Sequence, residues 1–242
     1  MVGKKIIITG GGRGLGYAMA KKFVSEGAQV LITGRKEETL KRVSEEIGCM
    51  YLVFDVTQFD QFDVFLEKAD DLLNGANVLV NNAGISLHEG SIYNVSEDQY
   101  NQQFDTNLKA CYFLTKEFLK RYCDNERANG SVLFLSSERG EYVDDIPYGL
   151  IKSAINSLTK GLAKTHIKKN IRINAVAPGI TATEMTRRSE DNLYTEKYAT
   201  GRYYLPDEVA EIACFLVSDV SSCLSGQILV CNNAYSVNHY KK

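Results

Sequence analysis

The sequence has no surplus of basic charge and no long apolar run, and each absence excludes a class of partner. Lys and Arg together number 28 and Asp and Glu number 30, so the net charge is −2. A chain without a basic surplus is not expected to bind the phosphate backbone of a nucleic acid. Its apolar runs also fall short of the ~20 residues that a membrane-spanning helix needs. We therefore expect no nucleic acid and no membrane as partners.

The cysteines form no metal-binding or redox pattern. The chain has 6 of them, with no Cys-x-x-Cys pair and no His and Cys spacing typical of a zinc site. HExxH and Walker motifs are missing as well. We therefore predict no metal site. Residues Met1–Lys5 lead directly into an apolar segment rather than into a signal peptide, so we expect reduced thiols in a cytoplasmic protein.

Short apolar runs alternate with longer amphipathic stretches along the chain. Nearly continuous apolar runs are expected when both faces of a strand are covered. The expected strands are Lys4–Thr9, Ala28–Thr33, Met50–Phe54, Asn77–Val80, Ser131–Ser136, Ile171–Val176 and Gln227–Cys231. The expected helices are Leu15–Glu26, Glu37–Ile47, Gln58–Leu73, Glu97–Arg121, Tyr148–Ile167 and Pro206–Val217. This alternation predicts an α/β fold, a single-domain, Rossmann-like, doubly wound, seven-stranded parallel sheet with helices on both faces, over residues 1–242.

A glycine-rich turn, Thr9–Gly16, follows the first expected strand and precedes an amphipathic stretch. Gly10, Gly14 and Gly16 give it the pattern G-x-x-x-G-x-G. Glycines allow a tight turn and let the backbone approach a pyrophosphate at the N-terminus of a helix. The turn therefore predicts a dinucleotide site, and the alternative is a flexible glycine turn without a ligand.

The end of the second expected strand indicates which dinucleotide is bound. An NAD site normally places a carboxylate there, to bind the ribose 2′-hydroxyl. This chain has Gly34-Arg35-Lys36 instead. Arg35 and Arg13 offer guanidinium groups that suit a 2′-phosphate, although both arginines could be solvated surface residues. We expect NADP(H) to be preferred, with NAD(H) as the alternative.

The position of one Tyr-x-x-x-Lys pair distinguishes it from the others. The pairs are Tyr17/Lys21, Tyr112/Lys116 and Tyr148/Lys152. Only Tyr148/Lys152 comes shortly after a central expected strand that ends in Ser136-Ser137. On a helix, Tyr148 and Lys152 stand one turn apart on the same face. We interpret the other two pairs as ordinary helix-surface residues.

Together these motifs resemble the short-chain dehydrogenase/reductase family over nearly the whole chain. Asn81-Asn82-Ala83-Gly84 after the fourth expected strand and Pro178-Gly179 with Thr183 after the sixth add to the resemblance. It implies a catalytic tetrad of Asn107, Ser137, Tyr148 and Lys152. The cofactor contacts that it implies are Gly10, Gly12, Arg13, Gly14, Leu15, Gly16, Arg35, Asp55, Val56, Asn82, Ala83, Gly84, Tyr148, Lys152, Pro178, Gly179, Thr181 and Thr183.

The resemblance also implies a role for each member of the tetrad. Tyr148 would be the general acid in carbonyl reduction, with its pKa lowered from ~10 by the Lys152 ammonium and the nicotinamide cation. Ser137 would hydrogen-bond the substrate oxygen, and Asn107 would hold a water that relays protons. The segment between Ser137 and Tyr148 is shorter than usual in the family, so Ser136 is an alternative to Ser137.

We expect an NADP(H)-dependent oxidoreductase that interconverts a ketone and a secondary alcohol. The expected substrate is a free small or medium carbonyl or hydroxy compound, over which Tyr194 and Tyr198 of the Thr181–Leu205 loop would close. The generic pattern is closest to 3-oxoacyl-carrier-protein reductases, so a fatty-acid role is the alternative. A non-catalytic nucleotide-sensing or scaffold protein is an alternative of another class.

Charge runs and departures from the family pattern bear on this choice. The acidic run Glu138–Asp145 would repel an acidic carrier protein if it flanks the active-site mouth, whereas the basic stretch Lys164–Arg172 could dock one.

Asn232-Asn233-Ala234 stands where the family commonly has Asp-Gly-Gly. His88 either touches substrate or is a solvated bystander. The resemblance also implies a homodimer or homotetramer, paired through the long expected helices.

Overall fold

A computed structural model of the protein describes residues 1–124, 129–189 and 191–237. One parallel sheet has the strand order β3-β2-β1-β4-β5-β6-β7. The strands are β1 (Lys5–Thr9), β2 (Gln29–Gly34), β3 (Met50–Val53), β4 (Val78–Asn81), β5 (Gly130–Leu135), β6 (Ile171–Pro178) and β7 (Ile228–Cys231). Each lies within two residues of an expected strand. The predicted α/β, Rossmann-like, seven-stranded sheet is confirmed.

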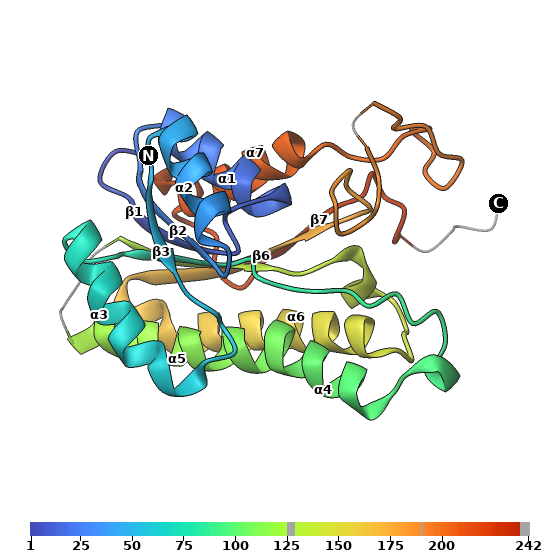
Figure 1. Cartoon of the computed structure of the whole chain (residues 1–242), viewed down its shortest axis with the longest axis horizontal. Helices are drawn as coiled ribbons and strands as arrows, with labels where there is room; N and C mark the ends of the chain where they lie inside the picture. The colour runs from blue at the N-terminus through green and yellow to red at the C-terminus, as the bar shows by residue number, and fades with distance from the viewer. Residues whose placement is uncertain (125–128, 190, 238–242) are drawn as a thin grey trace.

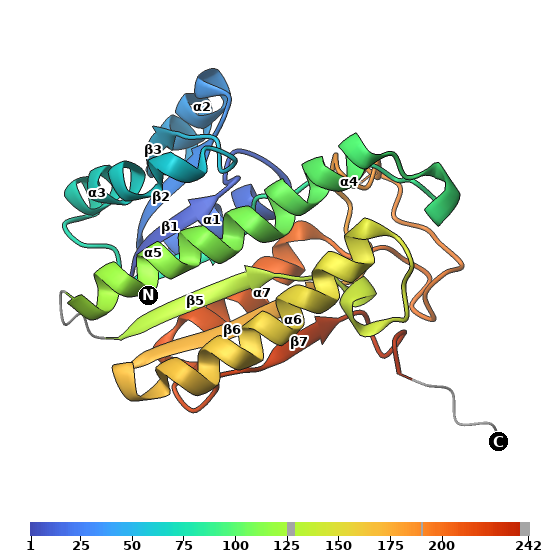
Figure 2. The same ribbon diagram turned by 90° about the horizontal axis from the view of Figure 1, so that it is seen from below.

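Helices cover both faces of the sheet (Figures 1 and 2). The helices are α1 (Gly14–Ser25), α2 (Glu37–Ile47), α3 (Phe62–Leu73), α4 (Glu97–Phe104), α5 (Ala110–Asp124), α6 (Pro147–His166) and α7 (Pro206–Val217). One face carries α1, α2 and α7, and the other carries the remaining four (Figure 1). Ile6 and Ile8 of β1 pack into the core on the α1 side, whereas Ile7 packs into the opposite core, and all three are fully buried. Each contributes about 1.5–3 kcal/mol of burial free energy.

The strand order has a switch point at β1 and β4, which are paired neighbours in the sheet. From β1 the chain proceeds outward through β2 and β3, whereas β4 to β7 extend to the other side. Ligands of open α/β sheets bind at such a switch point, outside the carboxyl ends of the strands. Thr9, the last residue of β1, links the ends of β1 and β4. Its hydroxyl accepts hydrogen bonds from the backbone N–H groups of Asn82 and Ala83, both at 3.0 Å.

The expected helix Glu97–Arg121 is interrupted, which corrects the sequence-based prediction. A π-helical turn over Asp105–Lys109 separates α4 from α5. Such turns are frequent at functional sites, and residue composition gives little signal for them. The turn contains Asn107, whose side-chain amide binds the backbone N–H and C=O of Ile85, each at 2.8 Å.

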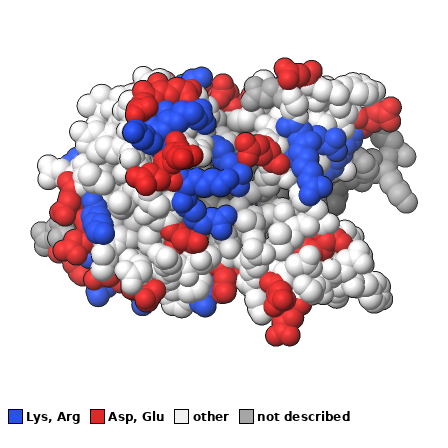
Figure 3. Space-filling model, viewed as in Figure 1, with Lys and Arg blue, Asp and Glu red and all other residues white. Residues whose placement is uncertain are grey.

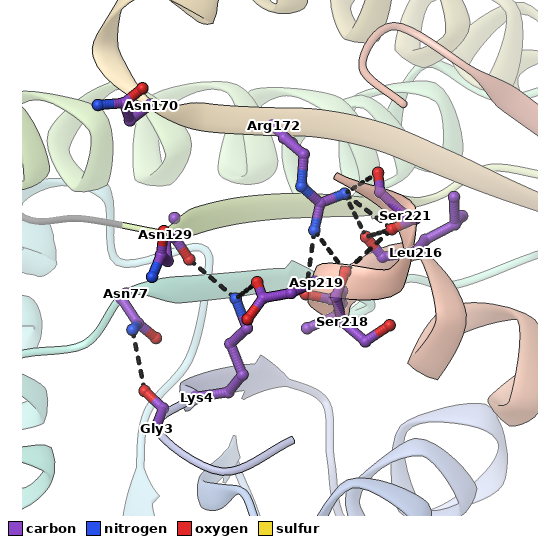
Figure 4. A network of polar contacts seen from close by, with 12 residues as sticks. Gly3, Lys4, Asn77, Asn129, Asn170, Arg172, Leu216, Ser218, Asp219 and Ser221 are labelled. Atoms are coloured by element: carbon purple, nitrogen blue, oxygen red, sulfur yellow. Dashed lines mark hydrogen bonds and ion pairs between the residues drawn. The ribbon is translucent and has the colours of Figure 1, made fainter. Parts of the chain in front are cut away.

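A polar network ties the amino ends of the strands to the end of α7 (Figure 4). The Arg172 guanidinium donates hydrogen bonds of 2.8–3.2 Å to the carbonyls of Leu216, Val217, Ser218 and Ser221 and to the Ser221 hydroxyl. A cation at the C-terminus of a helix satisfies its last carbonyls and its dipole. Lys4, nearly fully buried, binds Asp219 at 2.6 Å. The expectation that Arg172 belongs to a docking surface is therefore wrong.

Candidate active site

The glycine-rich turn forms a close-fitting cradle at the start of α1. Gly10 and Gly14 have φ angles of +67° and +53°, which favour glycine. A Cβ added to Gly16 would lie 2.3 Å from the carbonyl oxygen of Gly10, so only glycine fits there. Within the described residues no side chain caps the first turn of α1. Its first N–H groups are therefore available to an anion, and the cradle fits a dinucleotide pyrophosphate.

The two arginines expected to select the cofactor lie on neighbouring strand ends. Arg35 follows β2 and is exposed, and Arg13 follows β1 in the glycine-rich turn. Arg13 forms an exposed ion pair of 2.8 Å with Glu184. Sequence reasoning missed Glu184, because nothing in the spacing of the two residues indicates that the loop containing Glu184 crosses the glycine-rich turn.

Other expected cofactor contacts follow the carboxyl ends of further strands. Asp55 and Val56 follow β3, and the Asp55 carboxylate fixes this turn by accepting hydrogen bonds from the Thr57 N–H (2.9 Å) and hydroxyl (2.8 Å). Asn82 donates to the carbonyls of Thr9 (2.8 Å) and Gly10 (3.0 Å). The remaining expected residues also lie at this edge of the sheet: Gly12, Leu15, Ala83, Gly84, Pro178, Gly179, Thr181 and Thr183.

Ser137, Tyr148 and Lys152 meet where β5 ends and α6 begins. Pro147 occupies the first turn of α6 and places Tyr148 and Lys152 one turn apart. The Lys152 ammonium lies 5.4 Å from the centre of the Tyr148 ring and donates a hydrogen bond of 2.6 Å to the Leu135 carbonyl. Ser137 is near enough to Tyr148 for its side chain to lower the pKa of the tyrosine. The structure therefore brings these three expected residues together.

The two adjacent serines have different surroundings. Ser136 is buried, and its hydroxyl donates to the Asn156 side chain at 2.6 Å. Ser137 is only partly buried and begins the short 3₁₀ turn η4 (Glu138–Glu141). The Ser136 hydroxyl thus binds α6, whereas that of Ser137 accepts a hydrogen bond of 3.2 Å from the backbone N–H of Arg139.

Burial controls the ionisation of the tyrosine and the lysine. It raises the pKa of Tyr148, and the hydrogen bond with Ser137 and the charge of Arg139 oppose this shift. Burial lowers the pKa of Lys152 from 10.5 to about 8. The expected lowering of the Tyr148 pKa is therefore not produced by the protein's own residues.

Asn107 anchors the segment that follows β4. Its amide binds the Ile85 backbone in both directions, and its Oδ1 lies 3.2 Å from where a Cβ on Gly84 would be. The water relay expected of Asn107 stays a prediction. His88 is exposed, has a φ of +57° and contacts the Met185 carbonyl of the neighbouring loop at 3.0 Å.

Glu138 is a buried residue of the site that sequence reasoning placed on the surface. Its carboxylate accepts hydrogen bonds from Lys197 (3.0 Å), Tyr198 (2.9 Å) and Asn232 (3.2 Å). Asp144 of the same acidic run is paired with Arg139 at 2.5 Å. Glu138 is thus removed from the expected acidic surface, whereas Glu141 and Asp145 of the same run are exposed. Lys197 is distant from Glu138 in the sequence, and the spacing of Arg139 and Asp144 is an ordinary one. The sequence therefore indicated neither pair.

The surface of the protein carries charges of both signs. On the face drawn in Figure 3, basic and acidic side chains are intermixed, as the small net charge of −2 suggests. Within residues 1–124, 129–189 and 191–237, no helix has the length and apolar character needed to cross a membrane. The same residues contain no group of three or more His, Cys, Asp or Glu side chains arranged to hold a metal ion.

Comparisons with known proteins agree with this geometry. Residues 10–236 match the sequence profile of the family described as "Enoyl-(Acyl carrier protein) reductase". The 3-oxoacyl-(acyl-carrier-protein) reductase FabG of Chlamydia pneumoniae is 33% identical over 240 residues, which cover 95% of this chain and 96% of that protein. A 3alpha-hydroxysteroid dehydrogenase of Mediterraneibacter gnavus is 32% identical over 243 residues, with 96% of each chain covered.

A solved structure shows the same arrangement in space. The 3-ketoacyl-(acyl-carrier-protein) reductase from Brucella melitensis, complexed with NADH, superposes with a TM-score of 0.90 at 28% identity. The match covers 98% of this chain and 99% of that one. Fold, site and sequence similarity thus agree, and the chain belongs to the short-chain dehydrogenase/reductase family of oxidoreductases.

Proposed function

We propose that the protein is an NADP(H)-dependent oxidoreductase that interconverts a ketone and a secondary alcohol, with a free small or medium carbonyl or hydroxy compound as substrate. The observation that carries the proposal is the grouping of Tyr148, the buried Lys152, whose ammonium lies 5.4 Å from the centre of the Tyr148 ring, and Ser137, at the same edge of the sheet as the glycine cradle. When bound, the nicotinamide supplies or accepts the hydride.

The cofactor would be held along the carboxyl edge of the sheet. The N–H groups at the start of α1 would bind the pyrophosphate, because Gly10, Gly14 and Gly16 let it approach the backbone. Arg35 would bind the 2′-phosphate. Arg13 would join it, in exchange for the exposed ion pair with Glu184, which contributes little by itself. NAD(H) would lack the 2′-phosphate and bind more weakly.

Tyr148 would protonate the carbonyl oxygen during reduction. The raised pKa keeps its hydroxyl protonated at neutral pH, which is the form that a general acid needs. Ser137 would donate a second hydrogen bond to the same oxygen as negative charge develops there. Lys152, held by the Leu135 carbonyl, would place its ammonium beneath the tyrosine ring.

A second candidate is a 3-oxoacyl-carrier-protein reductase. The pairing of the buried Glu138 with Lys197 supports it, because this pairing removes one of the acidic charges that an acidic carrier protein would meet beside the site. The curated FabG relative points to the same substrate class. A scaffold role is disfavoured, because every member of the expected tetrad is present.

One set of assays tests these proposals. We would measure kcat/KM for small ketones and for an acetoacetyl carrier-protein thioester, with NADPH and with NADH. Turnover of free ketones with a preference for NADPH would support the first candidate. A large advantage for the protein-bound thioester that shrinks with added salt would favour the second. Equal efficiency with both cofactors would refute the assignment of Arg13 and Arg35.

We also propose that the protein is a cytoplasmic homodimer or homotetramer. A groove between α5 and α6 has an apolar floor of Tyr112, Leu119, Leu158 and Leu162, with Lys116, Lys120, Cys123 and His166 also lining it, and the exposed Phe113 lies on the same helix as Tyr112. Covering such a groove with a second copy would remove apolar surface from water. The cysteines are all free, which suits a reducing compartment. Light scattering that shows a monomer at micromolar concentration would refute the oligomer.

A further inference from the structure

The Glu138 carboxylate joins three segments that are far apart in sequence. Glu138 directly follows Ser137 and is only 2% exposed. Its Oε1 accepts from the Lys197 ammonium at 3.0 Å and from the Tyr198 hydroxyl at 2.9 Å, both in the loop 181–205. Its Oε2 accepts from Asn232, which follows β7, at 3.2 Å. The residue next to Ser137 thus fastens both the loop and the end of the last strand.

Tyr198 extends this connection to the segment expected to bind the nicotinamide. Its hydroxyl donates to Glu138 and also accepts a hydrogen bond of 2.7 Å from the backbone N–H of Ile180. The same carboxylate lies against Gly179, because a Cβ added there would be 3.1 Å from Glu138 Oε2 and 2.8 Å from the Tyr198 hydroxyl. A continuous set of hydrogen bonds therefore runs from Glu138 to the backbone that follows β6.

The surroundings hold this carboxylate in place. Lys197 lies 5.3 Å from the ring centre of Tyr198 and 5.0 Å from that of Tyr235. Asn232 is buried, and the next two residues, Asn233 and Ala234, have φ angles of +48° and +65°. Asn233 and Ala234 thus form a left-handed turn without glycine, and this turn presents Asn232 to Glu138.

A buried ion pair is weak grounds for a role in stability. The cost of removing both charges from water offsets most of their attraction, and apolar replacements often stabilise a protein as well. The directional bonds of such a group do fix the register of the segments that it joins. Here those segments are the one that presents Ser137 and the one at Gly179–Ile180.

We propose that Glu138 is a positioning residue that acts through Tyr198. It sets the placement of the Gly179–Ile180 segment, and so of the nicotinamide, relative to Ser137 and Tyr148. This inference rests on the proposed function, since it assigns the alignment of hydride transfer to a residue that touches neither substrate nor cofactor.

The experiment compares Tyr198→Phe and Glu138→Gln with Tyr203→Phe as the matched control. Tyr203 packs edge-on against the Tyr198 ring at 6.5 Å in the same loop, but only Tyr198 binds Glu138. Loss of a buried hydrogen bond that leaves its partner unsatisfied corresponds to roughly a 5- to 150-fold effect. We expect kcat to fall by about tenfold in the two test variants, with a higher KM for NADPH. Tyr203→Phe is expected to have the same kcat and the same KM for NADPH as the wild type.

The isotope effect separates positioning from mere structural support. With NADPH that carries deuterium at the transferred position, misalignment slows hydride transfer, so the deuterium effect on kcat is expected to rise in both test variants. Their unfolding midpoints are expected to stay close to that of the control. The proposal would be overturned if the deuterium effect on kcat were unchanged and each variant lost activity only in proportion to the fraction of protein that is unfolded.

A second readout needs no turnover. Trypsin cleavage after Arg187 and Arg188 reports how firmly the loop 181–205 is held. Faster cleavage in Tyr198→Phe and Glu138→Gln than in Tyr203→Phe supports fastening by Glu138, and equal cleavage overturns it. If the wild type reduces no carbonyl compound with NADPH, the proposed function fails, whereas the cleavage comparison still decides whether Glu138 fastens the loop.

Discussion

Replacing Lys152 with methionine is expected to stabilise the free protein while abolishing turnover. Lys152 is 7% exposed, and within the described residues its ammonium forms no ion pair. Burial lowers its pKa from 10.5 to about 8. At 1.36 kcal/mol per pKa unit, holding the charged form in the fold costs about 3 kcal/mol. Methionine removes this cost and keeps much of the volume.

The loss of one hydrogen bond offsets part of the gain. The Leu135 carbonyl accepts from the Lys152 ammonium at 2.6 Å, and leaving it unsatisfied costs about 1–3 kcal/mol. The expected net gain at pH 7 is therefore at most about 2 kcal/mol. For a chain of this size, each kcal/mol raises Tm by about 2–4 °C. Urea denaturation of the wild type and the variant, without cofactor, measures the difference.

The pH dependence of the stability difference tests whether the buried charge of Lys152 causes it. Because the folded pKa of Lys152 is lowered, its cost to stability is full below about pH 8 and disappears as the pH rises toward 10.5. The difference in unfolding free energy should thus shift by about 2 kcal/mol toward the wild type between pH 7 and pH 9.5, so that Lys152→Met loses its advantage. A variant that is less stable than the wild type at pH 7, with a difference that does not vary with pH, would refute the reasoning.

Four further substitutions test other parts of the structure. Arg35→Asp should weaken NADPH relative to NADH by roughly 10- to 150-fold in kcat/KM; an unchanged ratio would remove Arg35 from the site. Tyr148→Phe should lower kcat by ~10²–10⁴-fold with NADPH binding preserved, and retention of a tenth of the activity would exclude general acid catalysis by this residue. Ala234→Gly should raise unfolding free energy by about 1 kcal/mol, because alanine at φ +65° is strained; a lower Tm would contradict this. Arg172→Leu should cost about 2–3 kcal/mol in urea without changing KM, since the last carbonyls of α7 lose their donor; unaltered stability would show that water replaces it.

The sheet was predictable because its strands are buried on both faces. Runs such as Ile6–Ile8 leave no polar position for solvent, so they stand out from the amphipathic helices around them. The ends of elements were predictable where a local signal exists, as at Pro147 and Pro206, which begin α6 and α7. The interruption at Asp105–Lys109 was not predictable, since a π-helical turn keeps the composition of a helix.

The candidate site was predictable as far as its residues follow strand ends. Ser137 and Tyr148 are separated by a short turn and a helix start, so their meeting follows from β5 and α6 alone. Glu138 and Lys197 are brought together only by the path of the loop 181–205, which depends on long-range packing of Tyr198 and its neighbours. Because most runs of charged residues are solvated, the sequence predicts that Glu138 and Lys197 lie on the surface.

The packing of α1 against α7 affects the order in which the chain becomes functional. Phe23 of α1 and Val209 of α7 share one core, and the Lys4–Asp219 ion pair joins the first strand to the same C-terminal region. During synthesis the nucleotide-binding half emerges early, yet one side of α1 stays uncovered until α7 leaves the ribosome. Contacts between such distant parts of a chain form late in folding. The core around Phe23 is therefore completed only after α7 has been made.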